Sequence, residues 1–350
     1  MKKYFIGIDF SKEKFDVTLI VRENGTDSVV RLHKVFENSK SGFAAFMRWK
    51  KRVTDDAPSD EILFCGENTG RYSEAFARYL YGLGYDLWLE NPLQIKRSMG
   101  IQRLKNDKAD SAFIAEYAMR HEDKAKLYRM PSESLLALRE LFAYRLQLVK
   151  ERKAQHVRAK EIKATACSES KALGFILRSA AKLVKQYDED IARCDKLIRE
   201  LIDSDEELAG TYRIVTSIKG VAQQNATALI ICTDNFTRFD NARQLACYCG
   251  VAPFGKESGT SIHSPAHTSP LANMQMKTLL SEAAVCASIY NHTLKAYYDR
   301  LIRKGKHRGI ALNNVKNKLL HIIVAMVKNK TTFDVKYGYN LGKQYGTNIA

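Results

Sequence analysis

A seam of hydrophobic side chains between residues 173 and 201 constrains the fold of this chain more than any other feature of its sequence. The seam follows gaps of four and three residues throughout, which is a heptad repeat. Such a repeat predicts a long helix whose hydrophobic side packs against a partner helix. The seam consists of Leu173, Leu177, Ala180, Val184, Tyr187, Ile191, Cys194, Ile198 and Leu201.

The partner of this helix can lie within the chain or in a second copy of it. Hydrophobic residues between Leu135 and Val149 have similar spacing, which predicts an antiparallel helical hairpin within one chain. A dimerisation arm is an equally good interpretation, because a heptad seam does not identify its own partner. We therefore predict a helical coiled-coil region, expect a homodimer or tetramer, and leave the two arrangements open.

Alternating strand-like and helix-like patterns precede the seam and predict an α/β domain. Strands are expected at residues 4–9 and 15–21, close enough for a hairpin about residues 11–14. The further elements expected are a strand at 61–65, a helix at 72–83, a strand at 85–89 and a helix at 110–120.

The region after the seam is predicted to be mainly helical, with a polar loop at residues 251–270. Residues 218–221 followed by 226–231 have the form of a helix-hairpin-helix element, in which a turn at Gly220 presents backbone N–H groups to phosphate. We therefore divide the chain into an α/β domain at 1–128, a helical coiled-coil linker at 129–205, a mainly α domain at 206–335, and a poorly ordered tail at 336–350.

The charge balance predicts a polyanionic partner. The chain has 56 Lys and Arg against 39 Asp and Glu, a formal net charge of +17, and cations that neutralise phosphates release condensed counterions. We expect nucleic acid and no membrane, because no apolar stretch approaches the roughly 20 residues that span a bilayer. The seven scattered cysteines and the absence of a signal-peptide pattern predict a cytoplasmic protein, associated with the nucleoid if its partner is DNA.

Four acidic residues lie at strand ends and at a helix start. Asp9 ends the first strand, Glu67 follows the strand at 61–65, and Asp107 and Asp110 lie three residues apart at the start of a helix. Singly, the last two could cap that helix and Glu67 could be a loop residue. Two-metal phosphoryl chemistry needs several carboxylates at one point, because the ions lie about 3.5–4 Å apart. The combination therefore predicts a site for Mg²⁺, with Mn²⁺ as the alternative.

Basic residues crowd around the last two acids, so that a phosphate could lie beside carboxylates that would otherwise repel it. They are Lys96, Arg97, Arg103, Lys105 and Lys108. Residues 300–330 form a second basic segment that contains no acidic residue. From this segment we predict nucleic-acid contacts by Arg303, Lys304, Lys306 and Arg308.

Ser258 is the candidate nucleophile of the polar loop. A hydroxyl that attacks phosphorus must be exposed and close to groups that stabilise the developing charge. Ser258 lies next to Gly259, with Lys256 and Glu257 before it, and we predict that Lys256 and Gly259 contact nucleic acid. From these residues alone a turn is the better interpretation, because Ser-Gly in a polar loop is typical of one.

Two sets of motifs stand in order along the chain. The first is Gly-Ile-Asp at 7–9, Glu-Asn-Thr-Gly-Arg-Tyr at 67–72, Asn-Pro-Leu-Gln at 91–94 and Lys-Asn-Asp-Lys-Ala-Asp-Ser at 105–111. The second is Phe239 and Leu245, then Gly-Val-Ala-Pro at 250–253 and Ser-Gly at 258–259. Together they resemble insertion-sequence DEDD transposases, the IS110 group that includes the Piv and MooV invertases and the bridge-RNA-guided recombinases. Members of the group usually have Thr where Asn106 stands.

The resemblance implies a fold, a chemistry and a set of partners. The N-terminal domain would be RNase H-like (RuvC-like), with Asp9, Glu67, Asp107 and Asp110 as the acids that bind Mg²⁺. Ser258, with Ser261 as the fallback, would cut DNA through a transient phosphoserine link. The partners would be donor DNA, target DNA and a structured bridge RNA, which two basic segments, residues 145–185 and 300–330, could hold. Because the acids and the serine fall in separate predicted domains, the active site could be completed between subunits.

Three other functions are consistent with parts of the pattern. A metal-dependent nuclease or junction resolvase would keep the fold and use water in place of Ser258. A sugar-kinase-like ATPase also opens with Gly-Ile-Asp, but residues 10–12 lack the phosphate hairpin that it requires. A non-catalytic nucleic-acid-binding protein would leave four acids repelling one another without a metal.

Overall fold

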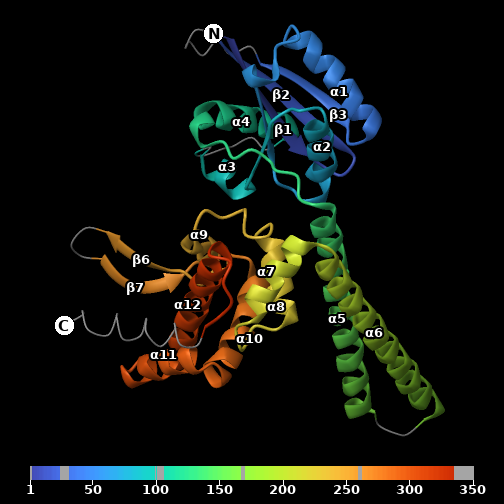
Figure 1. Ribbon diagram of the computed structural model, residues 1–350. Coiled ribbons are helices and arrows are strands. Elements are labelled where there is room, and N and C mark those ends of the chain that lie inside the picture. The colour runs from blue at the N-terminus through green and yellow to red at the C-terminus, as the bar shows by residue number, and fades with distance from the viewer. Residues whose placement is uncertain are drawn as a thin grey trace. The chain divides into compact units, whose positions relative to one another are not determined.

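The computed structural model of the chain describes residues 2–23, 31–98, 100, 106–166, 170–258 and 262–334, with the backbone alone at residues 2, 256–258 and 262–266 (Figure 1). The predicted tail at 336–350 lies outside these residues. The chain divides into two compact units, Met1–Met130 (unit 1) and Pro131–Ala350 (unit 2). Within the described ranges, every helix is too short or too polar to cross a membrane.

The described part of unit 1 is built on a five-stranded sheet in the order β3-β2-β1-β4-β5. β1 and β2 form an antiparallel hairpin, β3 pairs antiparallel with β2, and β4 and β5 extend the sheet by parallel pairing. This order and these directions fit the RNase H-like fold that the resemblance implies. The strands are β1 Lys2–Phe10, β2 Lys14–Glu23, β3 Leu32–Glu37, β4 Ile62–Glu67 and β5 Leu87–Glu90.

Hydrophobic side chains cover both faces of this sheet. On one face, the ring of Phe15 packs against the rings of Phe46 in α1 and Phe76 in α2, with centroids 5.9 and 5.0 Å away. On the other face, Phe5 and Trp88 are buried together with residues of α4. The helices of unit 1 are α1 Lys40–Val53, α2 Arg71–Gly82, α3 Pro92–Ser98 and α4 Asp107–Arg120, with 3-10 turns at Ser59–Glu61 and Glu122–Lys124.

The predicted α/β character of the N-terminal region is confirmed. The four expected strands are β1, β2, β4 and β5, and the two expected helices are α2 and α4. β3, α1 and α3 were not expected. β3 is an edge strand on which only Phe36 is fully buried, so it lacks the alternation of hydrophobic and polar residues that indicates a half-buried strand.

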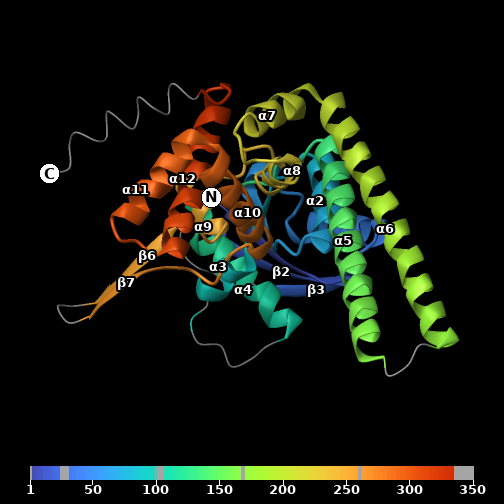
Figure 2. The ribbon, with the colours of Figure 1, turned by 90° about the horizontal axis from the view of Figure 1, so that it is seen from below.

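In unit 2, helices α5 (Glu133–Thr165) and α6 (Lys171–Ser204) lie side by side and run antiparallel (Figures 1 and 2). The seam turns inward, since Ile191 and Ile198 are buried while Leu197 between them is 40% exposed. Arg145 Nε of α5 donates to Asp195 Oδ1 of α6 at 2.6 Å. The structure thus contains the hairpin within one chain, and a coiled coil between copies stays a prediction.

The rest of unit 2 is mainly helical, as expected, and has its core around α12. Val315, Leu319 and Ile323 of this helix are fully buried, and α12 contacts α7, α9, α10 and α11. The helices are α7 Glu206–Thr216, α8 Gln223–Cys232, α9 Ala242–Tyr248, α10 Met274–Tyr290, α11 His292–Arg303 and α12 Arg308–Lys328.

The prediction of an unstructured polar loop at residues 251–270 is wrong. The segment forms an antiparallel pair of strands, β6 (Pro253–Ser258) and β7 (Ile262–Thr268). The pairing shifts register between Phe254 and Lys256, an interval that has Gly255 on one strand and a proline on the other. Such a bulge breaks the two-residue alternation of a strand, which is why the sequence pattern did not indicate the hairpin.

Candidate active site

Asp9 lies near the end of β1, where the strand turns into the β1–β2 hairpin. Two residues earlier, Gly7 allows a very close approach of α4, because a Cβ atom at Gly7 would overlap the backbone of Ser111 and Ala115. Helix α4 is therefore in direct contact with β1, and its first turn reaches the end of the strand that carries Asp9.

The other three predicted acids lie at the same edge of the sheet. Glu67 ends β4, which is parallel to β1 and adjacent to it. Asp107 and Asp110 occupy the first turn of α4. Asn106 caps this helix, since its Oδ1 accepts a hydrogen bond from Ala109 N at 2.8 Å. Asparagine is among the residues preferred at this N-cap position.

The charges of the three other predicted acids act on Asp9. Burial raises the pKa of Asp9 from 3.8 to about 6, with further contributions from Glu67, Asp110, Asp107 and Asp16, in that order. Burial and then Asp110 also raise the pKa of Glu67. Carboxylates that share a site disfavour one another's ionisation unless a cation lies among them.

The chemistry of these side chains fits a divalent ion, although the residues as described do not form a complete coordination sphere. Within the described ranges, no group of three or more Asp, Glu, His or Cys side chains is arranged closely enough to hold a metal. Carboxylate oxygens are nevertheless the ligands that Mg²⁺ and Mn²⁺ prefer. Part of the spacing comes from Lys14, whose Nζ donates to Asp107 Oδ2 at 2.8 Å and lowers the pKa of Asp107.

A fifth acid at this edge, Asp16, escaped the sequence analysis. Its side chain is buried in β2, and its Oδ2 accepts a hydrogen bond from Lys14 Nζ at 3.1 Å. Its Oδ1 lies 2.9 Å from His33 Nε2 of β3. A signal was available, because a hairpin that turns at residues 11–14 pairs Asp16 with Asp9 across the two strands.

The predicted basic residues of unit 1 lie on the surface where the structure describes them. Lys96 and Arg97 end α3, and Lys108 lies in the first turn of α4; all three are exposed. None of the three forms an ion pair with a described carboxylate. Arg103 and Lys105 lie outside the described residues.

In unit 2 the predicted nucleic-acid contacts fall into two groups. Arg303, Lys304, Lys306 and Arg308 form the exposed turn between α11 and α12. Gly220 lies in the turn between α7 and α8 with a φ of +108°, and a Cβ atom there would lie 2.6 Å from the backbone N of Ala287 in α10. Helix packing therefore requires glycine at this turn, whether or not phosphate binds there.

Ser258 is the last residue of β6, and its backbone pairs with Ile262 of β7. The hairpin projects from the helices of unit 2, and the candidate nucleophile lies toward its free end (Figure 1). The side chains of Ser258 and Lys256 are not among the described ones, and Gly259 and Ser261 lie outside the described residues.

The other end of the hairpin, its root, is fixed to the helices. Asn273 N donates to Tyr248 O at 2.8 Å, and Asn273 Nδ2 donates to Tyr248 Oη at 2.9 Å. Asn313 of α12 donates to the carbonyl of Val251 at 2.9 Å. These hydrogen bonds hold both legs of the hairpin against α9, α10 and α12.

The chain is similar to known transposases over most of its length. Residues 6–162, which contain the four acids, match the DEDD transposases of the IS110 type. Residues 212–299, which contain Ser258, match the transposase family IS116/IS110/IS902.

Individual relatives extend this similarity. The pilin gene-inverting protein of Moraxella bovis is 25% identical over 343 residues, which is 95% of this chain and 98% of the relative. A putative transposase, y4qE, of Sinorhizobium fredii is 25% identical over 292 residues, 81% of this chain and 71% of the relative. An uncharacterized protein of insertion element IS110 from Streptomyces coelicolor is 31% identical over 121 residues, 35% of this chain and 30% of the relative.

Proposed function

Because the chain belongs to the DEDD transposases of the IS110 family, we propose that it cleaves and rejoins DNA through Ser258, assisted by a divalent metal ion at Asp9, Glu67, Asp107 and Asp110. The family consists of transposases and DNA-inverting recombinases, so the chain is an enzyme that acts on DNA. The proposal assigns individual residues to that activity and names Mg²⁺ as the ion.

The observation that carries the proposal is the crowding of carboxylates around Asp9. Burial first, and then the charges of the neighbouring acids, raise the pKa of Asp9 to about 6, so ionised Asp9 is unfavourable as it stands. A divalent cation removes that repulsion, and at neutral pH it finds Asp9 ionised and able to bind. When bound, the ion supplies positive charge to the oxygens of the reacting phosphate.

The covalent step is a phosphoryl transfer to serine and back. Ser258 Oγ loses its proton and forms a bond to phosphorus, while the bond from phosphorus to one bridging oxygen of the DNA strand breaks. The departing oxygen takes up a proton, so that one DNA end is esterified to Ser258 and the other is a free hydroxyl. Attack by the hydroxyl of a second DNA end reverses the step, releases Ser258 and joins the strands.

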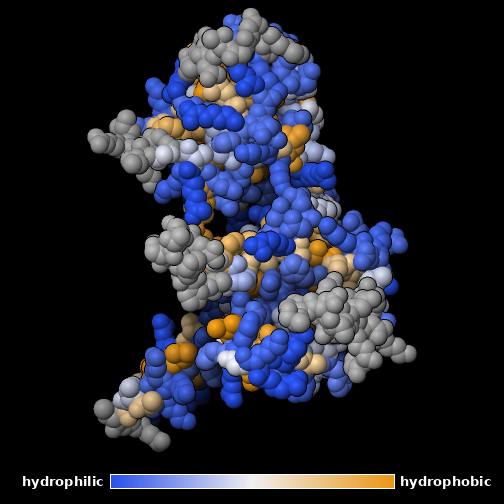
Figure 3. All heavy atoms as spheres, turned by 90° about the vertical axis from the view of Figure 1, so that its left-hand side faces the viewer, coloured by the Kyte–Doolittle hydropathy of each residue, from blue (hydrophilic) through white to orange (hydrophobic). Residues whose placement is uncertain are grey.

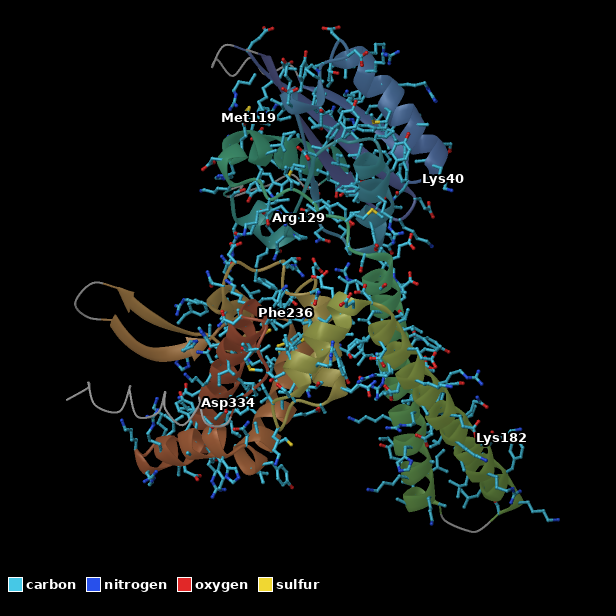
Figure 4. The ribbon with its side chains drawn as sticks, viewed as in Figure 1. Lys40, Met119, Arg129, Lys182, Phe236 and Asp334 are labelled. Carbon is cyan, nitrogen blue, oxygen red and sulfur yellow. The ribbon has the colours of Figure 1, made fainter. Side chains whose placement is uncertain are left out.

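A bridge RNA and a homodimer or tetramer complete the proposal. Support for a nucleic-acid partner of this kind comes from residues 145–185, which contain eleven Lys or Arg against three Glu and include the exposed Lys182 of α6 (Figure 4). The face of the molecule in Figure 3 is largely hydrophilic with small hydrophobic patches, which suits a partner with a charged backbone. Sequencing of RNA that copurifies with the protein tests this part.

The test of the nucleophile is a search for a protein–DNA adduct. Full-length protein is incubated with Mg²⁺ and a supercoiled plasmid that carries the DNA flanking the coding sequence, and DNA that stays attached to protein in SDS is measured. We expect Ser258→Ala to abolish the adduct and recombination, and Ser261→Ala to retain both. An adduct that persists in Ser258→Ala and disappears in Ser261→Ala would move the role to Ser261.

The same assay separates the rival functions. A nuclease that uses water would cut DNA without an adduct, and Ser258→Ala would cut as well as the unchanged chain. A non-catalytic nucleic-acid-binding protein would show neither cleavage nor Mg²⁺ binding that depends on Asp9.

A further inference from the structure

Two partly buried lysines lie on α10 and α12, the packed helices that hold the root of the β6–β7 hairpin. Lys277 belongs to α10 and Lys316 to α12. Lys277 Nζ donates to Thr268 Oγ1 at 3.4 Å, which places its ammonium group at the last residue of β7. Burial lowers the pKa of Lys316, and the positive charge of Lys277 lowers it further, so the two ammonium groups interact.

No described carboxylate compensates these two charges. Neither lysine forms an ion pair within the described ranges, and the segment 300–330 that contains Lys316 has no acidic residue. Lys50 of unit 1 provides a contrast, because it is buried but donates to Tyr85 Oη at 2.9 Å and lies over that ring. Two like charges that are partly removed from water, without a counterion, are unfavourable in the absence of an anion.

A third cation lies against the other leg of the hairpin. The guanidinium of Arg243 in α9 lies 6.0 Å from the ring centroid of Phe254 in β6. Phe254 pairs with His267 of β7, and Pro253 pairs with Thr268. The ammonium group of Lys277 therefore lies beside β7 and the guanidinium of Arg243 beside β6, within one or two residue pairs of each other along the hairpin.

We propose that Lys277 and Lys316, with Arg243 beside them, form a phosphate-binding site that holds one phosphodiester of the DNA backbone at the root of the hairpin. The hydrogen bonds of Asn273 and Asn313 fix this root, so the cations are preorganised for the ligand. From Phe254 to Ser258 a strand extends about 13 Å. The bound phosphate then lies a few nucleotides from the one that is cut. The inference rests on the proposed function only in taking the bound strand to be the one that Ser258 attacks.

The site is tested by the salt dependence of DNA binding in the full-length chain, without metal. Binding of a labelled DNA duplex is measured by fluorescence anisotropy at several NaCl concentrations for Lys277→Met, Lys316→Met and the control Lys295→Met. Lys295 is an exposed lysine of α11 whose Nζ lies 3.7 Å from Asp299 Oδ2, so its loss changes the net charge equally. We expect each of the first two variants to reduce the slope of log affinity against log salt by about one, and the control to leave it unchanged.

Charge-preserving variants guard against misfolding as the cause. Lys277→Arg and Lys316→Arg should keep the slope of the unchanged chain, since they keep the positive charge. Slopes in the Met variants equal to that of Lys295→Met would overturn the proposal, and an effect seen with an RNA of the same sequence but not with DNA would overturn the assignment to DNA. Ser258→Ala should bind with an unaltered slope, so failure of the serine mechanism and failure of this site give different results.

Discussion

The carboxylate edge of unit 1, which carries Asp9, Glu67, Asp107 and Asp110, collects negative charges, and the hairpin root of unit 2 collects positive charges. The two groups of charges are positioned by different means. In unit 1, strand register and the close contact at Gly7 fix the backbone beneath Asp9. In unit 2, hydrogen bonds from the side chains of Asn273 and Asn313 hold the hairpin. Each group of like charges is unfavourable by itself, which supports the proposed cation in the first case and the proposed phosphate in the second.

The largest expected effect is on the chemistry of the carboxylate edge. Asp9→Asn removes the acid around which the others gather, and we expect Mg²⁺-dependent DNA cleavage to fall by about a thousandfold, since metal stabilisation of the reacting oxygens amounts to several kcal/mol. Cleavage rates measured at increasing Mg²⁺ check this. DNA binding without metal should be unchanged, because the cations of unit 2 are intact. Cleavage near the normal rate would contradict a metal role for Asp9.

The next effect concerns stability and compares two glycines of unit 1. Gly7→Ala places a Cβ atom on the backbone of Ala115, so we expect it to lower the free energy of unfolding by about 3 kcal/mol or more. Gly82→Ala is the matched control, because open space surrounds that position at the end of α2, and it should be neutral or slightly stabilising. Urea unfolding followed by tryptophan fluorescence reports on unit 1 alone, since Trp49 and Trp88 are the two tryptophans of the chain. Equal losses in the two variants would contradict the close contact.

A smaller effect is the pH dependence of unit 1 without metal. The pKa of Asp9 in the folded chain, about 6, lies above its ordinary value of 3.8, so folded Asp9 binds its proton more tightly than unfolded Asp9. Its contribution to stability is therefore fully present below pH 3.8 and is lost as the pH rises through about 6. We expect a loss of about 1–2 kcal/mol, after a discount for partial exposure.

Asp9→Asn isolates this contribution from those of other titrating groups. The variant should match the unchanged chain near pH 4 and be the more stable of the two at pH 7, as measured by urea unfolding at both values. Mg²⁺ should reduce the difference at pH 7. Parallel pH profiles for the two proteins would show that Asp9 is not perturbed.

The difference between the carboxylate edge and the hairpin root also explains what the sequence could predict. The acids of unit 1 lie at ends of strands and at a helix start, and local patterns indicate such positions. Asp16 required one more step, the pairing of its strand with that of Asp9. The root of the hairpin could not be predicted for two reasons. Lys277 and Lys316 come near each other only when α10 packs against α12, and the proline and the bulge in the hairpin obscure the sequence pattern of its two strands. Interactions within a strand or turn are visible in sequence, as is a periodic seam such as that of α6, whereas single contacts made by packing are not.

Lys14, Asp16 and His33 form a network at the carboxylate edge. In this network the ammonium group of Lys14 is a cation that belongs to the chain, whereas a divalent metal ion would be an exchangeable one. Lys14 is half-buried and donates to both Asp107 and the buried Asp16. Asp107 is also a proposed metal ligand, so in the metal-free chain Lys14 occupies a carboxylate oxygen that a divalent ion would use. The other carboxylate oxygen of Asp16 is held by His33. We therefore expect Asp16 to keep Lys14 in place when Asp107 leaves the lysine and binds the metal ion.

Lys14→Met is therefore expected to increase the affinity for Mg²⁺ by about two- to fivefold, a small effect because exposed ion pairs are weak. The measurement is competition by Mg²⁺ against Mn²⁺ followed by the electron paramagnetic resonance of free Mn²⁺. Lys12→Met is the matched control, since Lys12 lies in the same turn, carries the same charge and pairs with no described carboxylate. If the two variants change the affinity equally, the effect is one of net charge. If Lys14→Met weakens binding, Lys14 supports the metal site and does not compete with the ion. The carboxylate edge would then hold a cation of its own, unlike the root of the hairpin, where no carboxylate side chain is described beside the lysines.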